Sequence, residues 1–292
     1  MPEADMSAVR ARYRARSKNR QAARKLPVSG TAGAVLAFLW LERWTILRLS
    51  WCPVLLGTLA QRFAQRFAQD LAQDLAHDHA GWAGSGFLTI AAWAVVAVSL
   101  HRVILFGDRA PGTWLNIRFG KVEALFAILP AAYLITLLLT FIVLSALGLP
   151  TEFHVKGEPA MVLFLWIVMA VVFFLLARFC LVFPIAVMER RVDFALAWTL
   201  SRGNVWRMIG VWLVLTMLAY TVFGALDGLW FAALKLTPAA MTKEQFADSW
   251  LHLAVLDYPF SILLGALCVG ILSFAYKALA GFAPDAVLTP KA

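Results

Sequence analysis

The sequence predicts an all-α membrane protein, a bundle of six transmembrane helices with interfacial amphipathic helices. The chain has 292 residues, of which 62% are hydrophobic and only 15% charged, and its mean hydropathy is +0.76. Soluble globular domains are about 45–50% apolar and about 25% charged. Apolar segments of about 20 residues, the length that spans a bilayer core, recur along the chain. The basic residues also divide unequally between alternate loops, as expected for a multi-pass membrane protein.

Residues 1–30 predict a disordered, basic cytoplasmic tail. The acidic residues in this stretch are Glu3 and Asp5, and the basic residues are spaced so that a helix would have no apolar face. The stretch lacks the apolar core and cleavage site of a secretory signal, although its arginines leave an organellar transit peptide or a nucleic-acid-binding arm as alternatives. We expect contact with anionic phospholipid headgroups and no nucleic-acid partner. The basic residues are Arg10, Arg12, Arg14, Arg16, Lys18, Arg20, Arg24 and Lys25.

A membrane domain is predicted over residues 31–282. Five of its segments are long and apolar enough to cross a bilayer. These are residues 87–106, 124–149, 159–177, 208–226 and 258–276. The three cysteines (Cys52, Cys180 and Cys268) lie in or beside apolar runs, so we expect them to act as small hydrophobic residues rather than as disulfides.

The first crossing is harder to place, because Glu42 and Arg43 interrupt residues 31–47. One side of a helix there carries Leu36, Trp40, Trp44 and Leu47. This pattern favours an interfacial helix followed by a crossing at residues 49–61, with Pro53 in its first turns. A single crossing within 31–61 stays an alternative.

A tetrapeptide repeat, QRFA-QRFA-QDLA-QDLA-HDHA, occupies residues 61–80. A repeat of four nearly matches the helical period, so we expect an outer amphipathic helix that extends from the first span. Three glycines are expected to end this helix: Gly81, Gly84 and Gly86. The repeat also contains four potential metal ligands, Asp74, His77, Asp78 and His79. Because the two histidines point to different sides of a helix, we expect no metal site.

Six spans with an inner N-terminus place all but five of the 26 Lys and Arg residues on the inner side. The exceptions are Arg62, Arg66, Lys156, Lys235 and Lys243. This asymmetry predicts that both termini are cytoplasmic, with residues 283–292 as a second short tail.

A short amphipathic helix is predicted between the fourth and fifth spans. Pro184 is expected to end the fourth span. Asp193 suits a helix N-cap, and Gly203 suits the position after a helix. Asn204 is expected to cap the fifth span, with an aromatic and a basic anchor directly after it.

This region carries a family resemblance. The residues that carry it are, in chain order, Arg178, Pro184, Glu189, Trp198, Gly203, Asn204, Trp206 and Arg207. Together with the six-span layout, they resemble the YciC-like family of bacterial inner-membrane proteins, which is similar to the membrane domain of some glycerophosphodiester phosphodiesterases. The resemblance covers about residues 35–282. It implies a multi-pass protein of the bacterial inner membrane whose molecular activity is not established, and it does not imply phosphodiesterase activity.

No enzymatic signature accompanies the membrane pattern: the sequence has no P-loop, no GxSxG, no HExxH and no cysteine pair. We therefore expect a non-enzymatic protein without a cofactor that assists envelope or lipid organisation through its basic face. Candidate contacts for lipid phosphate at the inner interface are Arg102, Arg178 and Arg207. Ion pairing with Glu123 and Glu189 is the structural alternative.

The alternative function is a transporter or permease-like subunit. Asp227 and Asp257 lie near the outer ends of two predicted spans. A carboxylate within a span costs about 2.5–3.5 kcal/mol on insertion scales, so it marks a candidate path for an ion or a lipid. Shallow, hydrated carboxylates are the simpler interpretation. A membrane enzyme acting on phospholipid would need clustered acids near the inner arginines.

Overall fold

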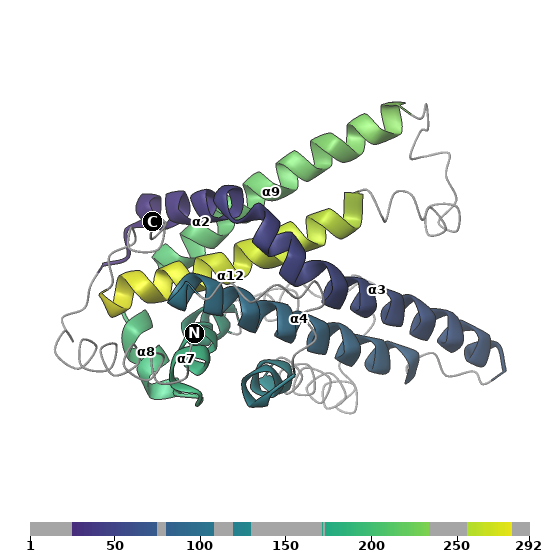
Figure 1. Ribbon diagram of the computed structural model, residues 1–292, viewed down its shortest axis with the longest axis horizontal. Coiled ribbons are helices and arrows are strands. Elements are labelled where there is room, and N and C mark those ends of the chain that lie inside the picture. The colour runs from purple at the N-terminus through teal and green to yellow at the C-terminus, as the bar shows by residue number, and fades with distance from the viewer. Residues whose placement is uncertain are drawn as a thin grey trace, which may run out of the picture.

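The computed structural model describes residues 25–74, 80–107, 119–129, 171, 173–233 and 256–281. In this part of the chain all regular elements are helices and none is a strand, which confirms the all-α class. Figure 1 shows them as a bundle of long helices with short helices at one end. The named helices are α2 (Val28–Leu41), α3 (Arg43–Asp74), α4 (Ala80–Phe106), α7 (Val182–Glu189), α8 (Phe194–Ser201), α9 (Val205–Ala233) and α12 (Tyr258–Ala280).

Among the described residues, three helices are long and apolar enough to cross a membrane: Thr89–Phe106 within α4, the whole of α9 and the whole of α12. Their mean hydropathies are 1.8, 2.0 and 2.0. They correspond to the predicted spans at 87–106, 208–226 and 258–276, and all three helices are longer than predicted.

The other predicted regions are described only in part. Residues 121–129 and 173–179 are helical, and they include the start of the predicted span 124–149 and the end of the span 159–177. The remainder of both spans lies outside the described residues, as do residues 1–24 and 282–292 of the two tails.

The chain first runs along the bundle as two helices that meet at Glu42, whose backbone departs from helical geometry (φ −100°, ψ 17°). Before α2, Leu26 bonds to Asn204 beside the start of α9, and within α3 the carbonyl of Trp51 accepts a hydrogen bond from the Tyr258 hydroxyl. The start of α9 and the start of α12 lie at opposite ends of the bundle (Figure 1). The segment from α2 to the first turns of α3 therefore extends from one end of the bundle to the other.

The charged residues at this junction bond locally. The Arg43 guanidinium donates to the Trp40 carbonyl at 2.7 Å and lies 5.0 Å from the Trp40 ring centroid, while the Thr45 hydroxyl donates to Glu42 at 2.8 Å. The predicted apolar face is confirmed, because Leu36, Trp40, Trp44 and Leu47 are all exposed, with Trp40 at 71%. The opposite face of α2 is buried against α12.

The α3–α4 hairpin corrects two predictions. Helix α3 starts at Arg43, so Pro53 lies in its interior rather than in the first turns. The repeat continues α3 as predicted as far as Asp74, and residues 75–79 lie outside the described residues, whereas the three glycines at 81, 84 and 86 lie inside α4. A helical glycine costs about 1 kcal/mol relative to alanine, and packing between α3 and α4 offsets that cost.

The packed core lies where α2, α4 and α12 meet. A side-chain carbon added at Gly265 would overlap the Trp93 ring, and one added at Gly270 would lie 3.3 Å from Val35. Phe38 of α2 packs edge-on against Phe274 of α12, with ring centroids 6.1 Å apart. Small residues on α12 thus let both neighbouring helices approach closely.

Local capping predictions are confirmed around α8. The Leu196 N–H donates to the Asp193 carboxylate at 2.9 Å, and Gly203 takes a left-handed φ of 75°. The break near Pro184 differs from the prediction. The helix over 173–179 ends first, a turn follows at 180–181, and Pro184 lies in the first turn of α7, where its missing N–H costs little.

Candidate functional site

One end of the bundle gathers basic side chains. The ends of α4 and α12 lie there beside the starts of α2 and α9, and α7 and α8 cover it (Figure 1). We call this region the cationic end. It is defined by Arg102, Arg178, Arg190, Arg191, Arg202 and Arg207.

Arg102, at the end of α4, forms an ion pair with Glu123. The two side chains are 3.1 Å apart, and the arginine keeps 35% of its side chain exposed whereas the glutamate is buried. Glu123 also accepts a hydrogen bond from the Gly120 N–H at 3.0 Å, which is half of a capping box for the helix over 121–129. The ion-pair alternative foreseen for Arg102 is therefore present.

Arg178 contacts an aromatic group of the cationic end. Its guanidinium carbon lies 3.5 Å from the Trp198 ring centroid, and Phe179 packs beside the same ring. A cation–π contact contributes about 0.5–2 kcal/mol, depending on desolvation. The Nε of Arg178 is buried and has no hydrogen-bond partner among the described residues. Two residues of the sequence motif, 20 positions apart, thus meet.

Asn204 and Arg207 hold the chain before α2. The Asn204 side-chain oxygen accepts from the Leu26 N–H at 2.8 Å, and Arg207 donates to the Leu26 carbonyl at 3.3 Å. The Leu26 side chain is only 1% exposed. Asn204 occupies the predicted position before α9, but the bond of its side chain to Leu26 is not one that local sequence reasoning foresaw.

Exposed aromatic and basic residues share the surface around α8. Trp206 is 75% exposed, Trp198 and Phe194 are about half exposed, and Arg202 lies in the turn between α8 and α9. Arg190 and Arg191 are also exposed, and Arg191 lies 3.6 Å from Asp193. Glu189, the motif residue before them, is half-buried. Tryptophan beside arginine is typical of the headgroup layer of a membrane.

A buried polar pair links α4 to α12 just inside the cationic end. His101 Nδ1 lies 2.6 Å from the Ser273 hydroxyl, which itself donates to the Val269 carbonyl at 2.8 Å. Because that hydroxyl has one proton, His101 is assigned as the donor through Nδ1. Sequence reasoning found no partner for His101.

Lys277, in the last turn of α12, is 2% exposed. Its ammonium donates to the Ile104 carbonyl in the last turn of α4 at 3.5 Å. The lysine therefore stabilises the end of a neighbouring helix, where carbonyl groups lack intrahelical donors and the helix dipole is negative. Sequence reasoning counted Lys277 only as an inner charge.

Asp227 and Asp257 lie at the end of the bundle opposite the cationic end. Both are half-buried; Asp227 is in the penultimate turn of α9, and Asp257 directly precedes α12. The Ser261 hydroxyl donates to the Asp257 backbone carbonyl at 2.8 Å. The groove described next includes neither carboxylate.

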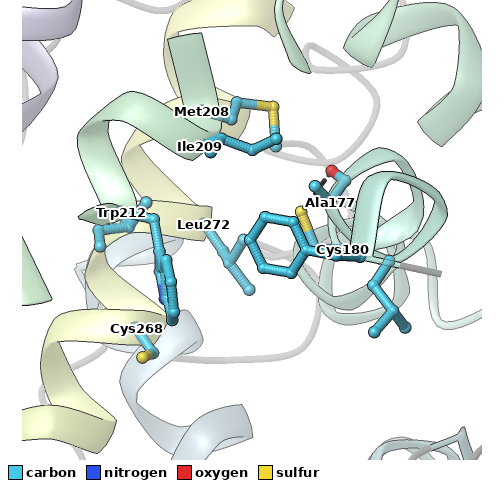
Figure 2. Close-up of a pocket in the computed structure, with 10 residues that line it drawn as sticks. Ala177, Cys180, Met208, Ile209, Trp212, Cys268 and Leu272 are labelled. Atoms are coloured by element: carbon cyan, nitrogen blue, oxygen red, sulfur yellow. Dashed lines mark hydrogen bonds between the residues drawn. The ribbon is translucent and has the colours of Figure 1, made fainter. Parts of the chain in front are cut away.

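A groove of about 190 Å³ lies between the helix over 173–179, α9 and α12. Figure 2 shows its lining as apolar side chains and two thiols. Its walls include Ala177, Cys180, Met208, Trp212, Cys268 and Leu272. Within the described residues no group of three potential metal ligands occurs, and His77, Asp78 and His79 lie outside them.

Comparisons with models of known families, with curated proteins and with solved structures each found no match. The resemblance to the YciC-like family therefore stays a prediction.

Proposed function

We propose that this protein is a multi-pass protein of the bacterial inner membrane that binds anionic phospholipid headgroups through its cationic end and takes part in envelope or lipid organisation without enzymatic activity. The observation that carries the proposal is the shared exposure of Arg202, Trp198 and Trp206 at one end of three apolar helices. Exposed tryptophans anchor a protein at headgroup depth, and arginines there meet lipid phosphate.

The direction of the helices supports a cytoplasmic position for this end. The end of α4, the start of α9 and the end of α12 lie together (Figure 1). By contrast, Arg62 and Arg66, which the sequence predicts on the outer side, belong to α3, and α3 extends to the opposite end of the bundle. Basic residues concentrate on the cytoplasmic side of membrane proteins, so the cationic end is assigned to that side.

The arginines of the cationic end divide into two roles under this proposal. Those named from the sequence, Arg102, Arg178 and Arg207, contact Glu123, Trp198 and Leu26, and they shape the end of the bundle. The exposed group, Arg190, Arg191 and Arg202, supplies most of the phosphate contacts. Each basic residue near an anionic surface contributes about 1 kcal/mol.

Native mass spectrometry of the full chain, extracted from nanodiscs of mixed phosphatidylglycerol and phosphatidylcholine, tests this proposal. Replacing the exposed group by glutamine (Arg190→Gln, Arg191→Gln and Arg202→Gln) is expected to lower the preference for phosphatidylglycerol about tenfold or more, since up to about 3 kcal/mol of attraction is lost. A matched control removes three charges that the sequence predicts on the outer side (Arg62→Gln, Arg66→Gln and Lys243→Gln) and should keep the preference. Equal loss in both variants, or no preference in the unmodified chain, would contradict the proposal.

A further inference from the structure

The groove of Figure 2 lies between two helices that are apolar enough to cross a membrane. Its floor comes from Cys268 and Leu272 of α12, and one wall comes from Met208 and Trp212 of α9. Apart from two thiols and the Trp212 indole the lining is apolar, so it offers few hydrogen-bonding groups to water or to a polar ligand. An apolar cavity of about 150 Å³ is known to stay dry and to bind small apolar molecules, and the groove has a similar size.

Two residues of the groove lining are neighbours, in the chain, of arginines of the cationic end. Its wall residue Met208 directly follows Arg207, and its wall residue Ala177 directly precedes Arg178. Phe174 contacts the exposed Trp206 with ring centroids 6.1 Å apart, so the two walls are joined beside a residue at headgroup depth. Any occupant therefore has an apolar part along the helices and a neighbouring cationic surface at one end.

We infer that this groove holds one acyl chain of a phospholipid whose phosphate contacts the cationic end. The inference rests on the proposed function, because the exposed arginines of the cationic end meet the headgroup, and it adds a defined binding site for a single lipid. Because lipid tails are already in an apolar medium, the acyl chain is held by van der Waals packing against the groove walls rather than by transfer from water, and filling the groove with a side chain removes that packing. Phe173 and Trp212 come from the two walls and pack against each other with ring centroids 6.0 Å apart, so the acyl chain lies beside this aromatic contact rather than between the rings.

Photo-crosslinking tests the inference. The full chain is reconstituted with phosphatidylglycerol that carries a diazirine in one acyl chain, and labelled residues are identified by mass spectrometry. We expect labelling at Trp212 and Cys268 to saturate and to be competed by unlabelled phosphatidylglycerol. Labelling of the outward residues Val214 and Met217, which are both exposed, should instead rise in proportion to the probe. Groove labelling that does not saturate would overturn the inference.

Two variants fill the groove, and one serves as a control. Cys268→Phe or the smaller Ala177→Leu should weaken saturable labelling about tenfold, which corresponds to ~1.4 kcal/mol. Val214→Phe adds a similar bulk on an exposed face and should leave it unchanged. Labelling is compared only between proteins that have the same thermal unfolding midpoint. If Cys268→Phe fails to fold, Ala177→Leu is used in its place. Unchanged labelling in a folded groove variant would overturn the inference.

A phosphatidylcholine probe separates the two claims. Equal saturable labelling of the groove by the phosphatidylglycerol and phosphatidylcholine probes would support an acyl-chain site in the groove. It would contradict the preference for anionic lipid in the proposed function. If the protein prefers phosphatidylglycerol but its groove is not labelled saturably, the proposed function is supported and the acyl-chain site in the groove is contradicted.

Discussion

Helices α9 and α12 have the same mean hydropathy of 2.0, yet they pack very differently. In α12, 67% of the residues of the most apolar window are buried inside the protein, whereas in α9 only 28% are. Large side chains such as Val214, Met217 and Leu229 point outward from α9. Hydropathy therefore indicates which segment enters a bilayer, while side-chain size and polar groups decide which helix lies at the centre.

Small residues account for the central position of α12. Gly265 and Gly270 let Trp93 and Val35 approach its backbone, and Ser273 bonds to His101. Lipid tails are as apolar as leucine, so close approach and interhelical hydrogen bonds, rather than hydrophobicity, favour helix association in a bilayer. At the α9 glycines 224 and 228, by contrast, an added side-chain carbon would have no described atom within 4 Å.

The largest expected effect comes from glycine replacement on the two helices. Gly265→Leu should destabilise the protein by about 3 kcal/mol or more, because the new side chain overlaps Trp93. Gly224→Leu, on α9, should be neutral or stabilise by up to about 1 kcal/mol, since no atom of the described residues lies within 4 Å of its added carbon. Thermal unfolding in detergent measures both. Equal destabilisation would show that α9 packs as tightly as α12.

A smaller effect is expected from the polar bond between α4 and α12. Ser273→Ala removes the acceptor of the buried His101 N–H and should cost about 2 kcal/mol, since a buried donor without a partner costs about 1–3 kcal/mol. Thr221→Ala, on the exposed face of α9, removes a hydroxyl that bonds only to its own helix and should cost less than about 0.5 kcal/mol. Thermal unfolding in detergent measures the loss of stability in both variants. Similar losses at both positions would remove the distinction between the two helices.

The smallest expected effect concerns the turn directly before α9, where Asn204 is buried. Asn204→Ala should cost about 1 kcal/mol, because the buried Leu26 N–H loses its acceptor. It should also speed tryptic cleavage after Lys25, since local opening exposes that bond. Arg202→Gln, an exposed change in the same turn, serves as the control. Unchanged cleavage in the Asn204 variant would mean that Leu26 is held by other contacts.

The sequence predicts those features that depend on local patterns. The Asp193 cap, the left-handed Gly203 and the shared face of Trp40 and Trp44 all follow from neighbouring residues. The long apolar helices α4, α9 and α12 follow from nearly uninterrupted apolar composition over about 20 residues. These signals need no knowledge of how the helices pack.

Contacts between distant residues could not be predicted in this way. The His101–Ser273 bond joins residues 172 positions apart, and the Lys277–Ile104 bond joins residues 173 positions apart. Their formation depends on the packing of α4 against α12, which no local pattern encodes. Packing against α3 likewise overrides the helix-ending tendency of the glycines at the start of α4.

The central claim is that the cationic end faces the cytoplasm. Cysteine labelling tests it most directly, in a variant whose Cys52, Cys180 and Cys268 are replaced by alanine. A membrane-impermeant maleimide should label Gln73→Cys in intact spheroplasts, and it should label Arg202→Cys only after the membrane is permeabilised. Labelling of Arg202→Cys in intact spheroplasts, with Gln73→Cys protected, would contradict the account.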